Sequence, residues 1–290
     1  STFPLTINVI FTATATTTLS YLGGGKEADL ITWTGGGSNT TVKAGLGADA
    51  ITLSGAATTS TVLGNEGFDT ISASALTANT NVYIGGGKGG DRINVVNQVG
   101  SIVGGYLNDT ITALGAFGGG VIYADKNGEK TGGTGTGSSA DGADVINFTA
   151  GTLAEGTTVY GAAGADTISF AVSSAASAVL IDGGNGADLI GNSAVLFFTA
   201  GIASTISGGA GADVIKFADA RTGLILGGAG TDSIFATTYS GVASINGGSQ
   251  NDTINFSNAT ILASTVNSAT INGGAGADSI ILATYTATTA

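Results

Sequence analysis

Short runs in which apolar and polar residues alternate recur along the chain, and an Asp precedes each run. Two residues after that Asp there is an Ile in all twelve runs, from Ile31 to Ile280, and four residues after it there is an apolar residue in eleven runs, with Asn192 as the exception. Alternation with a period of two predicts a short β-strand with one buried face. Seven residues before the Asp, a Leu, Val or Ile stands in eleven runs, for example Val42 and Ile181, which predicts a second strand.

The segment between the two predicted strands is rich in glycine and ends at the Asp. GGAGAD occurs at Gly208–Asp213 and again at Gly273–Asp278, and Gly stands five residues before the Asp in ten copies. Because glycine adopts positive φ freely, this segment predicts a tight turn. Successive aspartates are 18 to 26 residues apart, except for one step of 35. The aligned aspartates are Asp29, Asp49, Asp69, Asp91, Asp109, Asp144, Asp166, Asp188, Asp213, Asp232, Asp252 and Asp278.

One repeat is therefore a strand, a tight Gly-Asp turn, a second strand and a softer turn of Thr, Ser, Ala and Gly such as Ser54–Thr61 or Ser173–Ala178. A single copy buries too few apolar side chains to fold alone, so the copies are expected to stack. The sequence predicts an all-β protein, a parallel β-solenoid of about twelve rungs of ~20 residues with two strands per rung. The two parallel sheets are expected to face each other across a thin core.

The expected organisation is an N-terminal strand, first rung or cap over residues 1–22, followed by the solenoid over residues 23–290. The 35-residue step contains a Gly-rich stretch, which predicts a long loop at about 124–142 on the edge of the tight turns. The chain begins at Ser1 rather than Met and shows no basic, apolar leader, so it is expected to be processed or a fragment.

Composition excludes several classes of function. The chain has 290 residues with 51 Gly, no Cys and no His, so it lacks disulfides, thiolate metal sites and imidazole acid–base chemistry. The net charge of −12 argues against nucleic acid, which needs a basic surface. No run reaches the ~18 apolar residues of a membrane span, so no membrane insertion is expected. An enzyme is not expected.

Stacking would place the twelve aspartates listed above in a single file along one edge. Two carboxylates one strand spacing apart repel by about 0.9 kcal/mol even at the dielectric of water. A dication between adjacent turns would remove that repulsion, and oxygen-only ligands of flexible geometry suit Ca²⁺ better than Mg²⁺ or a transition metal. All twelve aspartates are therefore predicted ligands of several Ca²⁺ ions, and Asp141 and Asp182 are expected to supplement them. The alternative is that some of these aspartates only form turns.

The repeated GGxGxD-x-Ile-x units resemble the RTX, or haemolysin-type, calcium-binding repeats, over almost the whole chain from Gly23 to Ile281. The resemblance implies a right-handed parallel β-roll, calcium held between turns of the same side, and export by a type I pathway. An RTX roll has this turn on both edges, whereas here every second turn is a Thr/Ala/Ser loop. Calcium is therefore expected along one edge only, at no more than eleven sites between rungs.

Several turns depart from the motif. Glu27, Leu107 and Gln250 replace the third glycine, and Ser139-Ala140 replaces the first pair. The sites expected to be weakest are those near Asp29, Asp109, Asp144 and Asp252.

These features favour a non-catalytic structural protein of a bacterial cell-surface layer or extracellular filament, self-associating into a lattice or fibre. A cell-surface polysaccharide is a second candidate partner. Lys126 and Lys130 lie on the long loop, where contact with an acidic neighbour or a glycan is the less favoured alternative to plain solvation. One alternative is the calcium-folding region of a secreted RTX adhesin or exported enzyme. The less favoured alternative is an ice-binding solenoid, suggested by the Thr-rich stretch Thr12–Thr18.

Overall fold

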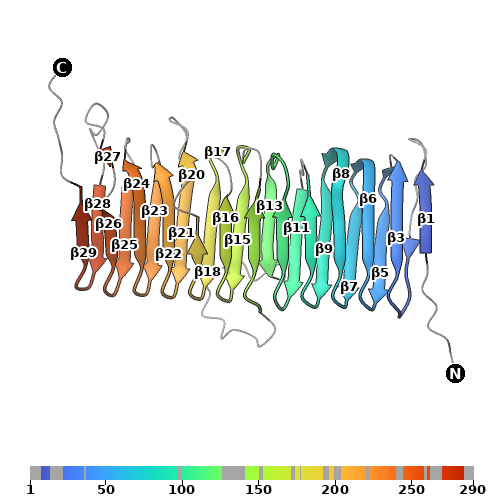
Figure 1. Cartoon of the computed structure of the whole chain (residues 1–290), viewed down its shortest axis with the longest axis horizontal. Helices are drawn as coiled ribbons and strands as arrows, with labels where there is room; N and C mark the ends of the chain where they lie inside the picture. Colours follow the sequence, from blue (N-terminus) through green and yellow to red (C-terminus); the bar gives the residue numbers. More distant parts are fainter. Residues whose placement is uncertain are drawn as a thin grey trace, which may run out of the picture.

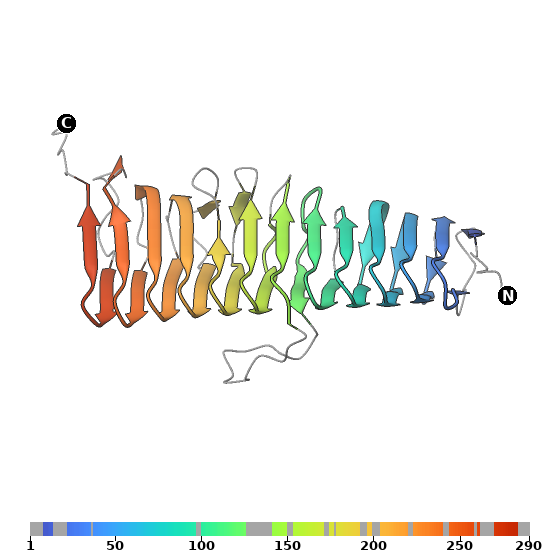
Figure 2. The same ribbon diagram turned by 60° about the horizontal axis from the view of Figure 1, so that its bottom comes forward.

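The chain forms a rod of stacked β-strands, with β1 (Asn8–Ala13) at one end and β29 (Ser279–Leu282) at the other (Figures 1 and 2). It is described here from a computed structural model. The residues that this structure describes are 8–13, 22–35, 37–96, 100–125, 141–149, 153–170, 174–176, 178–191, 196–198, 204–219, 223–239, 244–257, 260–261 and 270–283. Within these ranges the secondary structure is entirely β, and no apolar helix is long enough to cross a membrane.

One of the two sheets contains twelve strands, one for each copy of the motif, and each lies just before a tight turn. These strands are β2 (Leu22–Gly23), β5 (Thr41–Leu46), β7 (Thr61–Glu66), β9 (Val82–Lys88), β11 (Gly100–Tyr106), β13 (Gly120–Asp125), β15 (Thr158–Ala163), β18 (Leu180–Asn185), β21 (Ser204–Ala210), β23 (Gly223–Ala229), β25 (Ser244–Ser249) and β28 (Thr270–Ala275).

The second sheet contains seventeen strands, and twelve of them begin at the residue immediately after an aspartate of the motif. Its strands are β1, β3 (Leu30–Gly35), β4 (Gly37–Ser38), β6 (Ala50–Thr58), β8 (Thr70–Thr80), β10 (Arg92–Val95), β12 (Thr110–Ala113), β14 (Val145–Phe148), β16 (Thr167–Phe170), β17 (Ser174–Ala176), β19 (Leu189–Ile190), β20 (Leu196–Phe198), β22 (Val214–Asp219), β24 (Ser233–Tyr239), β26 (Thr253–Phe256), β27 (Thr260–Ile261) and β29.

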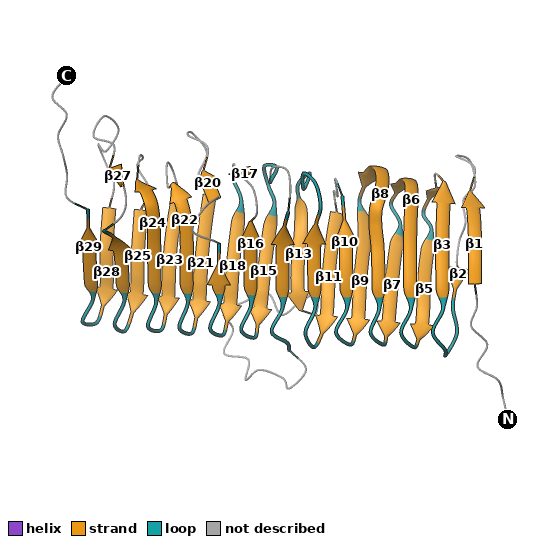
Figure 3. Cartoon of the chain, viewed as in Figure 1, coloured by secondary structure: helices purple, strands orange, loops and turns teal. Residues whose placement is uncertain are grey.

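All strand pairs in both sheets are parallel, and equivalent motif positions pair with each other. Ile206 of β21 is opposite Ile225 of β23, and Ile215 of β22 is opposite Ile234 of β24. The predicted fold, an all-β parallel solenoid with two strands per turn of about 20 residues, is confirmed. Figure 3 shows the two kinds of connection at opposite edges of the rod, with the tight turns along one edge.

The core is the set of side chains that point inward from the two sheets. The Ile two residues after each Asp is at most 1% exposed in every turn except the last described one, where Ile280 is 43% exposed. No described turn covers Ile280 on its far side. Larger side chains widen the core locally: Trp33 is buried, and Phe148 stacks on Phe170 with ring centroids 5.1 Å apart. The inward face predicted from the alternation is therefore correct.

The softer edge is more regular than expected. Ser54–Thr58, predicted as part of a loop, belongs to β6 and pairs with β8 through two register shifts. Likewise β17, within the predicted loop Ser173–Ala178, pairs with β20. Turns of similar length stack in parallel, so the backbone hydrogen-bond ladder continues around this edge.

The start of the long loop also differs from the prediction. Ala124 and Asp125 are the last residues of β13, and Asp125 pairs with Gly105 of β11. The pair Ala124-Asp125 therefore occupies the place of the first two turn glycines, and the assignment of that place to Ser139-Ala140 is wrong. Residues 126–140, including Lys126 and Lys130, and the Thr-rich stretch Thr14–Thr18 lie outside the described residues.

Candidate metal site: a column of buried aspartates

The twelve aligned aspartates lie at the end of the tight turns, and each is the residue immediately before the second strand of its turn. Eleven of them are no more than 3% exposed, and only Asp278, in the last described turn, is partly exposed. The structure thus brings all twelve predicted residues into one column, with their side chains directed into the turn rather than toward solvent. Such burial is unusual for a carboxylate without a partner of opposite charge.

One oxygen of each carboxylate, from Asp49 onward, joins its turn to the preceding one. The backbone N–H of each aspartate donates a hydrogen bond to Oδ1 of the aspartate in the next turn. The N···O distances are 2.7 Å for Asp29 to Asp49, 2.8 Å for Asp49 to Asp69 and for Asp69 to Asp91, 2.6 Å for Asp91 to Asp109 and for Asp109 to Asp144, 2.8 Å for Asp144 to Asp166 and for Asp166 to Asp188, and 2.9 Å for Asp188 to Asp213, Asp213 to Asp232, Asp232 to Asp252 and Asp252 to Asp278.

The other oxygen of most column members has no hydrogen-bond partner among the described residues. An unpartnered buried oxygen of this kind is costly, because it has lost water without gaining a donor. This Oδ2 atom is buried and unpartnered in Asp49, Asp69, Asp91, Asp109, Asp144, Asp166, Asp188, Asp213, Asp232 and Asp252.

The unpartnered oxygen lies beside the first glycine of its own turn and a backbone carbonyl of the next turn. A Cβ built on Gly208 would lie 2.5 Å from Asp213 Oδ2 and 2.5 Å from the carbonyl oxygen of Gly227. Glycine at this position therefore leaves room for the carboxylate. Carboxylate and carbonyl oxygens from two adjacent turns border the same small space, and these are the ligands that Ca²⁺ prefers.

Burial raises the pKa of the ten column carboxyls from Asp49 to Asp252, and neighbouring carboxylates raise it further. The pKa is about 9 for Asp109 and Asp166, about 7 for Asp91 and Asp213, and about 6 for Asp69. The N–H donated to each carboxylate acts in the opposite direction, since it stabilises the charged form. The column thus needs either protons or a cation to remain buried at neutral pH.

The residues present fit a hard cation held between turns. No three His, Cys, Asp or Glu side chains of the described ranges converge as a metal-binding group. Ligation would therefore combine one or two carboxylates with backbone carbonyl oxygens, as the contacts around Gly208 allow. The column carboxylates are the residues that would hold Ca²⁺, and the ion would supply the positive charge that the turn lacks.

Three of the four sites that the sequence predicts to be weakest keep the geometry of the column. Asp109, Asp144 and Asp252 have the same Oδ1 hydrogen bond and the same unpartnered Oδ2 as the regular turns. Leu107 and Gln250 adopt the left-handed conformation of the glycine they replace, with φ of 70° and 78°. The substitution is therefore absorbed as local backbone strain.

The first aspartate does differ. Oδ2 of Asp29 accepts a hydrogen bond of 2.6 Å from the N–H of Gly25 in its own turn. This oxygen is already satisfied, so Asp29 is the column member with the least need for a cation.

Asp125 is a buried carboxylate that the sequence pattern did not reveal. It is fully buried at the end of β13, and it accepts hydrogen bonds from the N–H of Gly142 at 3.5 Å and of Ala163 at 3.1 Å. Burial, with Asp144 and Asp141 nearby, raises the pKa of Asp125 to about 8. The sequence pattern did not predict this position because of the insertion. Asp125 aligns with a turn glycine only when residues 126–140 are left out of the alignment.

The two predicted supplementary residues lie differently. Asp141 begins the segment after the insertion and is close enough to Asp125 and Asp144 to raise the pKa of both. Asp182 instead occupies β18 next to Tyr160, on the outer face of the twelve-stranded sheet. Burial raises the pKa of Asp182, and Ser207 stabilises its charged form.

Comparisons of this chain with protein-family models, with curated proteins and with solved structures found no match in any of the three.

Proposed function

We propose that the chain is a non-catalytic structural protein of a bacterial cell-surface layer or extracellular filament. In this proposal Ca²⁺ ions bind between the stacked tight turns, make the rod rigid and allow it to self-associate into a lattice or fibre. The repeats are of the RTX type, and the protein reaches the cell surface by a type I-like export pathway.

The observation that carries the proposal is the file of ten buried Oδ2 atoms without a hydrogen-bond partner. A turn-forming aspartate has no need to bury its second oxygen, because a solvated carboxylate forms the same turn. A cation at each step would satisfy that oxygen, cancel the repulsion along the column and link adjacent turns. The uniform repeat also favours a mechanical role, since each rung contacts only its neighbours and the stack extends in one dimension.

Calcium dependence favours an extracellular location. Sites of modest affinity fill at the high calcium concentration outside cells, and the binding free energy adds to the free energy of folding. The chain would then stay unfolded during export and fold once outside.

The test is far-UV circular dichroism with millimolar CaCl₂, with millimolar MgCl₂ and with a chelator, followed by electron microscopy of the same samples. The proposal expects the β-signal to be strongest and most resistant to heating with calcium, and ordered filaments or sheets to form with calcium only. A chain that gives the same β-signal in all three conditions would contradict the calcium column.

A calcium-dependent fold that remains monomeric would contradict the assembly instead. It would favour the alternative function, the calcium-folding region of a secreted RTX adhesin or exported enzyme. The adhesin has one observation in its favour, a surface hollow lined by tyrosines on the twelve-stranded sheet.

A further inference from the structure

Tyrosines gather on one part of the outer face of the twelve-stranded sheet. Four of the seven tyrosines of the chain, Tyr83, Tyr106, Tyr123 and Tyr160, lie on the consecutive strands β9, β11, β13 and β15. All four side chains are half-buried. We refer to these four residues as the tyrosine group.

The strand register places Tyr123 and Tyr160 in one apolar row with Val103, whereas Tyr106 lies three residues further along β11, opposite Lys88 of β9. Val103 of β11 is opposite Tyr123 of β13, which is opposite Tyr160 of β15. The rings of Tyr123 and Tyr160 stack with centroids 5.1 Å apart and planes 9° apart. Val103 is only 4% exposed although it lies on the outer face, so the surrounding side chains cover it.

Tyr83 completes the row at the other end. A Cβ added to Gly85 would lie 3.2 Å from a ring carbon of Tyr83 and 3.2 Å from Cδ2 of Leu63. The absence of a side chain at Gly85 therefore makes room for the Tyr83 ring beside Leu63. From β7 to β15 the row contains no charged residue, and it ends at Lys43 of β5 on one side and at Asp182 of β18 on the other, so the two flanking charges are opposite in sign.

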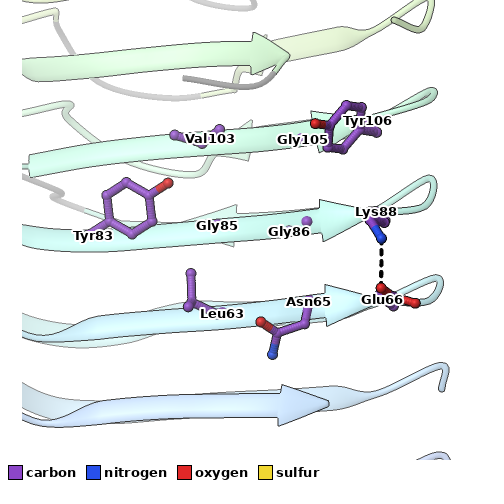
Figure 4. A pocket seen from close by; sticks show the side chains of 11 residues that line it. Leu63, Asn65, Glu66, Tyr83, Gly85, Gly86, Lys88, Val103, Gly105 and Tyr106 are labelled. Carbon is purple, nitrogen blue, oxygen red and sulfur yellow. Dashed lines mark hydrogen bonds and ion pairs between the residues drawn. The ribbon is translucent and has the colours of Figure 1, made fainter. Parts of the chain in front are cut away.

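A hollow of about 410 Å³ opens beside this row (Figure 4). Gly85, Gly86 and Gly87 of β9 form its floor with Gly105 of β11, so the floor is largely bare backbone. Tyr83 and Tyr106 flank it on opposite sides along the strand direction, and Asn65 and Val103 line it from the neighbouring strands (Figure 4). Its volume lies in the range of small-ligand sites in proteins.

The charges at the hollow are already paired with each other. Lys88 Nζ and Glu66 Oε1 are 2.7 Å apart at its rim, and both side chains are more than half exposed. The hollow thus offers polar groups and no net charge, on a chain of net charge −12. Neither an anionic nor a cationic ligand would gain an unpaired charge here.

We propose that the hollow and the adjoining tyrosine group bind a neutral glycan chain that runs along the rod axis. A sugar ring presents apolar C–H faces and polar hydroxyls together, and the site matches both: tyrosine rings and glycine backbone for the faces, and Asn65, the tyrosine hydroxyls and the Glu66–Lys88 pair for the hydroxyls. Strands repeat every ~4.8 Å along the axis, similar to the length of one sugar unit in an extended chain, so successive units would meet successive strands.

This inference goes beyond the proposed function and does not depend on self-assembly. For a surface protein, such a site would anchor the rod to a polysaccharide through a face of the sheet, leaving the turn edge for calcium. It also differs from the glycan contact at Lys126 and Lys130, the less favoured alternative for the long loop.

The test is isothermal titration of the full chain, in whichever calcium condition gives a folded β-signal, with a soluble β-1,4-linked glucose hexasaccharide as the probe. Binding is expected, and Tyr83→Ala combined with Tyr106→Ala should weaken it at least about tenfold. Tyr83→Phe with Tyr106→Phe should retain most of the affinity, because the rings remain. The matched control is Leu224→Ala on β23, which removes a 39% exposed apolar side chain from the same face outside the tyrosine group.

Two results would overturn the inference: no binding by the folded wild-type chain, or equal binding by the Tyr→Ala double variant and the wild type. Tighter binding of a sulfated glycan than of the neutral hexasaccharide would also overturn it, since the argument rests on a site without net charge. These results would leave the calcium-dependent fold and the filaments unaffected, so failure of the glycan site is distinguishable from failure of the proposed function.

Discussion

At the scale of single residues, the two oxygens of each column aspartate have different environments. For Asp213, Oδ1 accepts the N–H of Asp188 at 2.9 Å, whereas Oδ2 is buried without a partner. The first contact stabilises the stack in any state of protonation, since a neutral carboxyl also accepts a hydrogen bond. Because Oδ2 has no donor, the stability of the stack depends on whether a proton or a cation neutralises the carboxylate. The predictions at this scale therefore concern charge rather than packing.

The pH dependence of stability without calcium follows from the raised pKa values. Asp69 with a pKa of about 6, Asp213 with about 7 and Asp166 with about 9 all lie above the ordinary Asp value of 3.8. The folded chain then binds more protons than the unfolded chain, so the free energy of unfolding is highest below about pH 4 and falls as pH rises to about 9. Urea denaturation with a chelator at about pH 4.5, 6.5 and 8.5 measures this trend. An unfolding free energy that rises with pH would contradict it.

Replacing one carboxylate by its neutral isostere should have opposite effects with and without calcium. In Asp213→Asn the amide can still accept the N–H of Asp188, and no charge is buried. Without calcium at pH 8, the unfolding free energy should rise by on the order of 1–3 kcal/mol. With calcium the gain in stability per millimolar ion should be smaller than for the wild type.

Thermal or urea denaturation of both proteins, with and without calcium, tests this expectation. Glu66→Gln is the control, because it removes a negative charge from an exposed ion pair and should change the stability by less than about 0.5 kcal/mol in either condition. Loss of stability in Asp213→Asn under both conditions would mean that the charged form stabilises the turn by itself.

At the scale of the element, the tight turn is defined by positions that need left-handed backbone and lie against the next turn. Gly209 and Gly211 both have positive φ, at 111° and 143°. A Cβ on Gly211 would collide with the carbonyl oxygen of Gly186 in the preceding turn. Leu107 shows that a turn tolerates a side chain where its own conformation permits one.

Gly211→Ala should therefore lower the unfolding free energy by at least about 2 kcal/mol, because both φ and the close contact oppose a side chain. Gly156→Ala is the matched control: it has φ of 80° but no atom within 4 Å of an added Cβ. Its cost should be about 1 kcal/mol from the backbone alone. Urea denaturation of the two variants separates the cost of the backbone conformation from the cost of the close contact. Equal decreases in unfolding free energy would show that contact between turns contributes little.

At the scale of the whole molecule, the rod is held together by repeated contacts between neighbouring turns. Ile206, Ile225 and Ile245 pair in succession along the twelve-stranded sheet, and the opposite sheet repeats the arrangement. Such a stack has approximately additive stability, with one intrinsic and one interface contribution per turn. Removal of a complete turn should thus shorten the rod without unfolding it.

Deletion of residues 213–231 joins Ala212 to Asp232 and removes one full step of 19 residues. The shortened chain should retain its β-signal and bind about one calcium ion fewer. A deletion of about half this length should lower the signal more than the deletion of a full turn, because the strands that follow would meet the wrong sheet. Circular dichroism and small-angle scattering measure both outcomes, and a shortened but in-register chain that fails to fold would contradict an additive stack.

The strands, the tight turns and the inward face could be predicted from the sequence, because they depend on local patterns. Alternation with a period of two places Ile31 and Val42 on the buried face of their strands. The glycines before Asp213 favour a tight turn because they adopt positive φ freely. The same register predicted that the aspartates form one column. The stacked fold could be predicted from the repetition of the motif, since no single copy can bury its apolar face.

The environment of each column carboxylate could not be predicted in this way, because its burial and its hydrogen bonds arise between turns of the folded stack rather than within one turn. The structure shows that Oδ1 of these carboxylates accepts a hydrogen bond whereas Oδ2 has no partner in most of them. In Asp29, Oδ2 accepts a hydrogen bond from the N–H of Gly25. The structure also aligns Asp125 with a glycine across the insertion and gathers Tyr83 and Tyr160 on one face, although 77 residues separate them in the chain. Their proximity depends on the position of each turn in the stack. Because the turns differ in length, the spacing of the tyrosines along the chain does not show that they share one face.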